Sequence, residues 1–259
     1  MKSPVFCLVF LLAAAVQLQA AVEETEVMTI SPSAGDPLEI SSISGDVVIE
    51  EWNSDEMEFS YTIMADDQDD IQMVTVRCDT EEGVICTVEY DDSIVNSSSA
   101  RVDFSVMVPA GTALETYIEL VSGDVNIHGG SGTAEVVLVS GDLDVADYSG
   151  ELSAELVSGN MTASGCPGLR SAEVVSGDID CIAGRMEDDV YLASVSGNVG
   201  LHLADEAAVS VQTISGDFIL DDSFSASVTE GHGEKSAEFG SGEFQIEIET
   251  VSGSITVTR

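Results

Sequence analysis

The sequence predicts an all-β protein, a β-solenoid similar to a parallel β-helix, with coils of about 18–20 residues. The first observation is a repeat, because Ser-Gly-Asp or a close variant recurs along the chain within one apolar pattern. The second is the spacing, since successive copies from Ser122 to Ser215 lie 18 to 20 residues apart. The third is the near absence of helix signals. The copies begin at Ser44, Ser122, Ser140, Ser158, Ser176, Ser196, Ser215, Ser241 and Ser252.

The segment after each copy is predicted to be a short strand with one buried face. After Ser122, for example, Val125 and Ile127 are apolar and the residue between them, Asn126, is polar. The same alternation follows most copies, and a period of two residues is typical of a half-buried strand.

The residue before the serine is Val or Ile in every copy except the one at Ser241. Stacked coils place like residues about 4.8 Å apart, so we expect these residues to form continuous ladders inside the solenoid. They are Ile43, Val121, Val139, Val157, Val175, Val195, Ile214 and Val251.

The Ser-Gly-Asp segment itself is predicted to be a turn. Glycine adopts positive φ at little cost, and Asp or Asn hydrogen-bonds to nearby backbone groups. Asn160 and Asn198 stand where other copies have Asp, which indicates turn chemistry more than charge. A two-residue hairpin turn and the corner of a solenoid both fit, and the even spacing favours the solenoid. The predicted turn glycines are Gly45, Gly123, Gly141, Gly159, Gly177, Gly197 and Gly216.

The first part of the chain, residues 1–20, is predicted to be a signal peptide. Lys2 precedes an apolar run from Val5 to Val16, and Ala20 and Ala21 offer small residues for cleavage. We therefore expect an exported protein in the periplasm, on the cell surface or outside the cell. After signal cleavage we expect no integral membrane segment.

Residues 21–110 are predicted to form an N-terminal β region that caps the solenoid, because the ends of a solenoid need to be covered. Pro109-Ala110-Gly111 marks its boundary, and residues 111–259 are the repeat region with an excursion at about 221–241. The strands expected in the N-terminal region are Val47–Trp52, Met57–Met64, Ile71–Cys78, Val84–Tyr90 and Val102–Val108.

Four cysteines follow the predicted signal peptide. Cys78 and Cys86 flank a segment that a turn at Gly83 would close, so the two would be cross-strand neighbours. In an oxidising compartment they are predicted to form a disulfide. Cys166 and Cys181 lie at different offsets in adjacent repeats, and the sequence leaves their pairing open.

The charge of the chain excludes some partners. The formal net charge is −41 at pH 7, from 48 acidic and 7 basic residues. A nucleic acid or an anionic membrane would be repelled, so we expect neither as a partner. An acidic surface suits solubility, cation binding or a basic partner.

Two segments resemble a known family. Ser44-Gly45-Asp46-Val47-Val48-Ile49-Glu50-Glu51-Trp52 is similar to its Gly-Asp-Ile-x-Ile-x-Gly-Trp opening, and the segment from Val102 to Pro109 is similar to the strand before its first repeat. The family is a bacterial β-strand-repeat domain of unknown function labelled "putative adhesin", related to auto-transporter adhesin head domains. The resemblance implies a secreted or cell-envelope β-solenoid without a known catalytic role.

Calcium is the one ion for which the sequence offers candidates. Asp124, Asp142, Asp178 and Asp217 would line the corners as hard oxygen ligands, as in secreted β-rolls that Ca²⁺ stabilises. The Gly-Gly-x-Gly-x-Asp signature of those β-rolls is missing, however. We therefore expect no resident cofactor.

The sequence names no reaction and no catalytic residue. A β-helix that cleaves polysaccharides would use Arg or Lys beside carboxylates, and Arg170 and Arg185 are the basic residues of the regular repeats. We expect instead a non-enzymatic interaction scaffold or adhesin. Its partner would be a protein or a glycan at the cell surface.

Overall fold

The structure is a computed structural model, and it describes residues 22–91, 100–183, 186–204, 207–221, 223–224, 227–231, 234–241 and 243–259. The predicted signal peptide and Arg185 lie outside these residues. The described part of the chain consists of β-strands joined by loops, with one four-residue helix, so the all-β prediction is confirmed.

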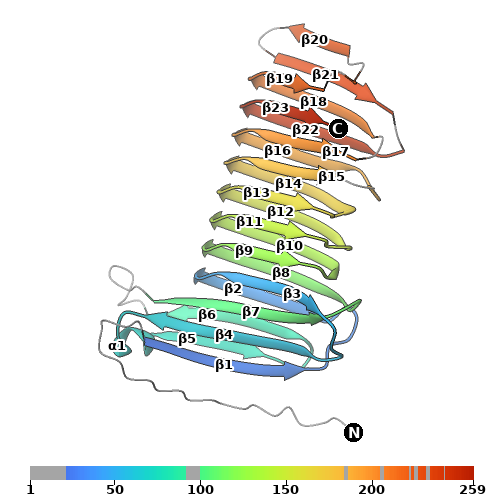
Figure 1. The fold of residues 1–259 in the computed structure, drawn as a ribbon. Helices are drawn as coiled ribbons and strands as arrows, with labels where there is room; N and C mark the ends of the chain where they lie inside the picture. The colour runs from blue at the N-terminus through green and yellow to red at the C-terminus, as the bar shows by residue number, and fades with distance from the viewer. Residues whose placement is uncertain are drawn as a thin grey trace.

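The strands form two long sheets that face each other (Figure 1). Sheet A has eleven strands, in the spatial order β1 (Val22–Ile30), β4 (Met57–Ala65), β7 (Arg101–Pro109), β3 (Val47–Trp52), β9 (Val125–His128), β11 (Leu143–Ala146), β13 (Met161–Ser164), β15 (Ile179–Ala183), β17 (Val199–Leu203), β23 (Ile255–Thr258) and β19 (Phe218–Leu220). Sheet B has twelve strands, in the order β20 (Ser227–Gly231), β21 (Glu234–Gly240), β18 (Ala208–Ser215), β22 (Gln245–Ser252), β16 (Val190–Ser196), β14 (Gly168–Ser176), β12 (Glu151–Ser158), β10 (Ser131–Ser140), β8 (Ala113–Ser122), β2 (Pro37–Ser44), β6 (Val84–Tyr90) and β5 (Val74–Asp79).

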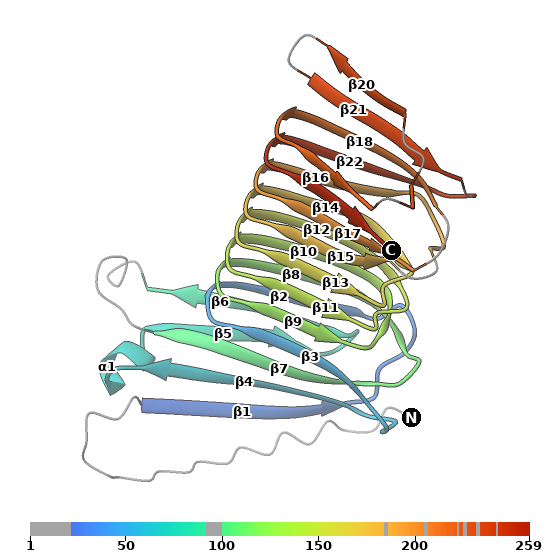
Figure 2. The same cartoon turned by 45° about the horizontal axis from the view of Figure 1, so that its top comes forward.

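Each repeat contributes one strand to each sheet, and the Ser-Gly-Asp segment is the corner between them. The strands of successive repeats pair in parallel, with Ser122 opposite Ser140 and Ser140 opposite Ser158. The paired serines are 18 residues apart, so one turn of the chain spans 18 residues there. Because the strands on the two sides of each corner lie in different sheets, the alternative of a hairpin per repeat is wrong. Figure 2 shows the bends of successive repeats stacked on one another.

The core lies between the two sheets. In sheet A the third and fifth residues after most of the serines point inward, and Val125 and Ile127 are buried as the alternation predicts. In sheet B the inward residues stand two and four positions before the serine, for example Ile118 and Leu120. Parallel register places each of these residues beside its equivalent in the next repeat, so apolar rows run the length of the molecule.

The N-terminal region extends the same two sheets. The copy at Ser44 joins β2 to β3, and these two strands lie directly beside β8 and β9. In sheet A, β7 pairs in parallel with β3, and β4 and β1 follow in antiparallel order. In sheet B, β6 pairs in parallel with β2, and β5 ends the sheet.

One predicted strand of this region begins later than expected. The prediction placed a strand from Ile71, but residues Gln68–Ile71 form the short helix α1 and β5 starts at Val74. The carboxylate of Asp67 accepts the backbone N–H groups of Asp69 and Asp70 and caps this helix. Ile71 is buried at the helix end, so its apolar character reflects a core contact and not a strand.

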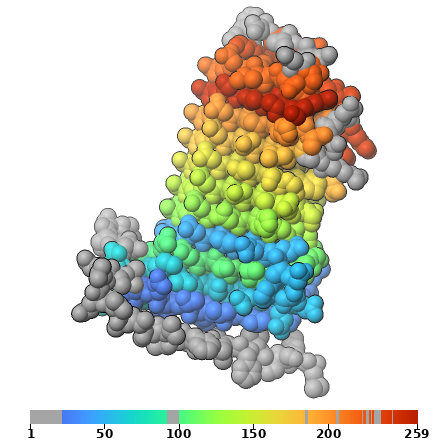
Figure 3. Space-filling view, in the orientation of Figure 1, coloured from blue at the N-terminus to red at the C-terminus, as the bar shows by residue number. Residues whose placement is uncertain are grey.

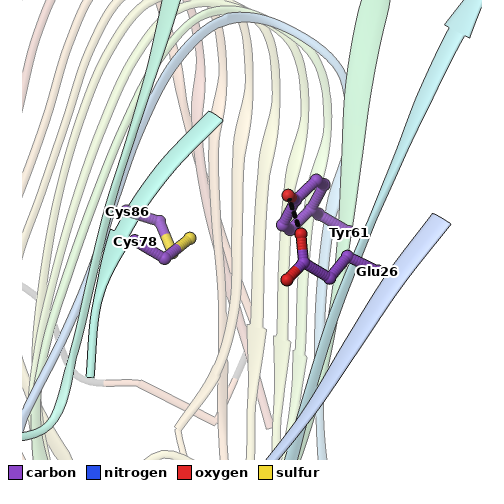
Figure 4. Close-up of a disulfide and its surroundings, with 4 residues drawn as sticks. All are labelled: Glu26, Tyr61, Cys78 and Cys86. Atoms are coloured by element: carbon purple, nitrogen blue, oxygen red, sulfur yellow. Dashed lines mark hydrogen bonds between the residues drawn. A yellow bond between two sulfur atoms is a disulfide. The ribbon is translucent and has the colours of Figure 1, made fainter. Parts of the chain in front are cut away.

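Cys78 and Cys86 are joined by a disulfide in the structure. They are direct cross-strand partners in the antiparallel pair β5–β6, as the turn at Gly83 predicts. Figure 4 shows this disulfide of sheet B and, on sheet A, the β1–β4 pair in which the hydroxyl of Tyr61 donates a hydrogen bond to the carboxylate of Glu26. Cys166 and Cys181 are buried free thiols.

The order of the last repeats differs from the expected simple succession. The C-terminal strand β22 lies between β16 and β18, and β23 lies between β17 and β19. Ser252 is thus paired with Ser196 on one side and Ser215 on the other. In Figure 3 the C-terminal residues form a dark red band between residues that precede them in the sequence.

The predicted excursion at about 221–241 contains a second departure. Strands β20 and β21 pair in antiparallel order, and β21 adds to the edge of β18. Gly240 is the last residue of β21 and lies opposite Ala208, so the copy at Ser241 does not follow a strand of the parallel stack. The excursion therefore extends sheet B beyond the last repeat.

Candidate functional site

The corner aspartates form a column of hydrogen bonds along the stack. In the six corners from Asp46 to Asn198, the side-chain oxygen Oδ1 accepts the backbone N–H of the equivalent residue in the next repeat. Asp124 N donates to Asp46 Oδ1 at 2.9 Å, Asp142 N to Asp124 Oδ1 at 2.8 Å, and Asn160 N to Asp142 Oδ1 at 2.7 Å. The column continues through Asp178, Asn198 and Ser254. Asp and Asn both supply this acceptor, which explains why they exchange at this position.

The two asparagines in the column also reduce repulsion between carboxylates. Asn160 Nδ2 lies 3.1 Å from Asp142 Oδ1, and Asn198 Nδ2 lies 3.2 Å from Asp178 Oδ1. Each amide donates a second hydrogen bond to the carboxylate of the preceding repeat. An aspartate there would instead place a second negative charge at that distance.

The corner glycine is required by close packing between repeats. Gly141 has φ of 145°, and a Cβ on it would collide with the carbonyl oxygen of Gly123 in the neighbouring repeat. Its own N–H donates to the carbonyl of Ser158 at 3.0 Å. The same collision would occur at the other predicted turn glycines that stack on a corner, including Gly197 and Gly216.

The four aspartates considered for Ca²⁺ have different surroundings. Asp124, Asp142 and Asp178 lie in the corner column and use Oδ1 to hold the backbone of the next repeat. Asp217, by contrast, pairs with Lys235, and this hydrogen bond lowers the pKa of the carboxyl. Among the residues that the structure describes, no group of three or more His, Cys, Asp or Glu side chains could hold a metal ion.

The Val or Ile before each corner points outward, so the prediction of inner ladders at this position is wrong. These residues are 45–57% exposed. The physical reason is strand alternation: the residue one position earlier is buried, as Leu138 and Leu156 are, and the next must face the other side. In spatial order this valine column consists of Ile43, Val121, Val139, Val157, Val175, Val195, Val251 and Ile214.

The valine column borders an open groove on the outer face of sheet B. The groove has a volume of about 370 Å³ and crosses strands β10 to β18. Its lining includes Val157, Val175 and Val195 together with acidic side chains such as Glu155 and Glu173. Contiguous exposed apolar surface with a polar rim is typical of an interaction site.

Tyr191 lies at the border of this groove. Its hydroxyl donates a hydrogen bond to Glu249 Oε2 at 3.0 Å. Partial burial, this hydrogen bond and the nearby carboxylates of Glu249, Glu173 and Glu247 raise the pKa of Tyr191 to about 12. The hydroxyl donates this hydrogen bond to Glu249 in its protonated form.

Other candidate groups have structural partners. Arg170 binds Glu151, with 3.0 Å between Nη2 and Oε1, and also pairs with Asp188. Burial raises the pKa of the Cys166 thiol and raises that of Cys181 to about 12. Both thiols are therefore protonated at neutral pH and are poor nucleophiles.

Within the described part of the chain, no helix has the length and apolar character needed to span a membrane.

Comparisons with solved structures find distant likenesses. A "putative cell adhesion protein" from Clostridium sporogenes is 12% identical, with 92% of this chain and 99% of that chain covered and a TM-score of 0.40. A "putative adhesin" from Bacteroides fragilis is 11% identical, with 90% and 97% covered and a TM-score of 0.46. A "putative lipid binding protein" from Parabacteroides distasonis is 14% identical, with 91% and 97% covered and a TM-score of 0.26. Similarity at this level says nothing about function.

No curated protein gives a significant match to the chain. The Toastrack DUF4097 family, by contrast, matches over nearly the whole length, from residue 18 to residue 258. This extent covers the N-terminal β region as well as all the repeats. The chain therefore belongs to the Toastrack DUF4097 family, a domain of unknown function, as the resemblance in its opening strands predicts.

Proposed function

We propose that this protein is an exported, non-enzymatic scaffold of the cell envelope that binds a surface protein or glycan through the valine column. The observation that carries the proposal is the column itself, in which eight apolar side chains are exposed in one continuous row. Seven steps of about 4.8 Å make this row about 34 Å long. In this proposal the stack holds the row rigid, and the N-terminal region and the β20–β21 hairpin cap its two ends.

The column can supply a substantial part of a binding free energy. Full burial of a valine side chain contributes about 1.5–3 kcal/mol, so burial of the remaining half contributes about 1 kcal/mol for each residue. Eight residues contribute about 8 kcal/mol together, whereas association costs about 4–15 kcal/mol. Apolar contact alone therefore gives weak binding, and a specific partner needs polar or charged contacts as well.

Adhesion of protein-coated beads to cells of the source organism tests this function. We expect Val175→Ser/Val195→Ser to abolish most of the adhesion, since both residues are 50% exposed in the column. Ile182→Ser/Ile219→Ser is the matched control, because these residues are also exposed but lie on sheet A. Equal adhesion of the two variants, both folded by circular dichroism, would rule out the column as the binding surface.

The non-enzymatic part of the proposal is supported by the position of Arg170, whose charge is paired with two carboxylates. We expect incubation with neutral and acidic polysaccharides to release no new reducing ends. Turnover that disappears in Arg170→Ala would instead support a polysaccharide-active enzyme.

A further inference from the structure

The valine column lies between two acidic columns. On one side, two residues before the valine, Glu119, Glu155, Glu173 and Glu249 point outward on the same face, and the uncharged Val137, Ala193 and Gln212 occupy this position in other repeats. Two residues along a strand correspond to about 7 Å, so these carboxylates lie within reach of any group that contacts the valines. On the other side, beyond the corner, are the exposed aspartates Asp124, Asp142 and Asp178, with the neutral Asn160 and Asn198 in the corners next to Asp178.

Among the described residues, basic side chains pair with corner aspartates near the two ends of the stack. Arg101 Nη1 lies 3.7 Å from Asp46 Oδ2, and Lys235 Nζ lies 2.7 Å from Asp217 Oδ1. Between these ends, the ion pairs of the described residues include none of the acidic residues named above for the two columns. Partial burial, above all, and the nearby carboxylates raise the pKa of Tyr117. The middle of the column is therefore an apolar stripe in a negative field.

The backbone beneath the column has no free hydrogen-bonding groups for an added strand. The strands from β2 to β18 are each paired on both sides within sheet B, so their N–H and C=O groups are used. A partner on this face must satisfy its own backbone, and an α-helix does so.

The spacing of the column also suits a helix that lies along it. Each step of the column is about 4.8 Å, and one helical turn rises about 5.4 Å. Apolar side chains that recur once per turn can therefore fit between successive valines over several turns. The groove borders five column residues from Val157 to Ile214, a length of about 19 Å that about 13 helical residues would span.

We propose that the valine column is the docking site for an amphipathic α-helix whose apolar stripe is flanked on both sides by Lys and Arg. This inference rests on the proposed function and adds the class of partner. A helix of this kind places its apolar stripe on the valines and one row of basic side chains toward each acidic column. A second copy of this chain does not fit, because its net charge of −41 would bring like charges together.

The test uses the full chain and synthetic peptides of about 18 residues, long enough to cover the groove. The first peptide has Leu at helical spacing with Lys on both flanks. The second has the same composition in scrambled order, and the third has the same Leu stripe with Glu on the flanks. Binding is measured by isothermal titration calorimetry at low and at high salt.

We expect the Lys-flanked peptide to bind about tenfold or more tightly than either control, and its affinity to fall as salt rises. Val175→Ser/Val195→Ser should weaken its binding about tenfold, and Ile182→Ser/Ile219→Ser should leave the affinity unchanged. Glu155→Gln/Glu173→Gln should reduce the salt dependence, since it removes two charges beside the groove. Equal binding of the scrambled peptide, or unchanged binding to the valine variant, would overturn the inference.

The results also separate this inference from the proposed function. If bead adhesion requires the valine column but the Lys-flanked peptide neither binds nor competes, the surface is right and the partner class is wrong. If adhesion does not require the column, the proposed function itself fails. A peptide that binds and blocks adhesion supports both.

Discussion

The corner residues show how one tripeptide stabilises a whole stack. The glycine allows two repeats to approach closely. Its N–H donates a hydrogen bond to a carbonyl of the next repeat, and the side-chain oxygen of the Asp or Asn accepts a backbone N–H of that repeat. The glycine has no substitute here because any Cβ meets a backbone oxygen, which cannot move aside. The acceptor oxygen, by contrast, is available from either Asp or Asn.

The first prediction compares two neighbouring substitutions in one corner. Gly141→Val should destabilise the protein by about 3 kcal/mol or more, because φ of 145° and the collision with Gly123 both disfavour valine. Asp142→Asn should change stability by about 0.5 kcal/mol or less, since it keeps the oxygen that accepts the N–H of Asn160. Chemical denaturation of both variants checks this, and equal losses would contradict the corner mechanism.

The second prediction concerns pH. Asn160→Asp should destabilise the protein by about 1 kcal/mol at neutral pH, because it replaces a donated hydrogen bond with a carboxylate between Asp142 and Asp178. Neighbouring negative charges raise the pKa of such a carboxylate in the folded state, so the penalty exists above that pKa. The loss relative to the unmodified protein should therefore shrink as pH falls into the acidic range. Urea unfolding at several pH values measures it, with Asp142→Asn as control.

At the scale of elements, the C-terminal strands are the most informative feature. β22 and β23 are inserted between two repeats that precede them in the chain, and Ile246, Ile248, Ile255 and Val257 are fully buried there. The insertion is possible because the repeats share one corner and one register, so any of them can pair with any other. Sequence similarity between repeats thus leaves their spatial order open.

The third prediction follows from this equivalence. In a chain that lacks residues 243–259, β18 should pair directly with β16, because Ser215 can take the position of Ser252 opposite Ser196. The N–H of Gly197, which bonds to Ser252, should then bond to Ser215 and remain protected. Hydrogen exchange measured at Gly197 and Val199 checks this. Rapid exchange at both would show that the last two repeats cannot replace each other.

At the scale of the whole molecule, a large negative charge coexists with an ordered stack. Self-repulsion destabilises a compact protein with a net charge of −41, and the backbone ladders and the continuous core must offset it. The acidic residues are arranged in rows because the repeat places like residues above one another. This arrangement concentrates the negative field beside the valine column.

The fourth prediction addresses calcium. We expect millimolar Ca²⁺ at constant ionic strength to leave the melting temperature of the full chain unchanged, since the corner aspartates already hold backbone N–H groups. Circular dichroism melts with and without the ion check this. A large rise in melting temperature that Asp124→Asn/Asp142→Asn removes would show instead that the corners are ion sites and support a Ca²⁺-stabilised β-roll.

The length of the repeat, the positions of the stacked corners and the inward face of the short strands follow from the sequence, whereas the copy at Ser241 is not a corner of the stack. These follow from local rules, namely the period of two in a strand and the backbone freedom of glycine. The Cys78–Cys86 pair is also local, because a single turn brings the two residues together. The prediction of a strand from Ile71 was wrong, because an aspartate caps a short helix there and the apolar pattern covers only a few residues.

The face of sheet B on which the valines lie and the position of the last repeat depend on long-range packing. An apolar residue in a strand is compatible with either face, and only the second sheet, packed against Leu138 and Leu156, assigned the valines before the corners to the surface. Likewise, nothing local distinguishes Ser215 from Ser252 as the neighbour of Ser196. Pairing between equivalent strands is set by long-range contacts, and those contacts exist only in the folded chain.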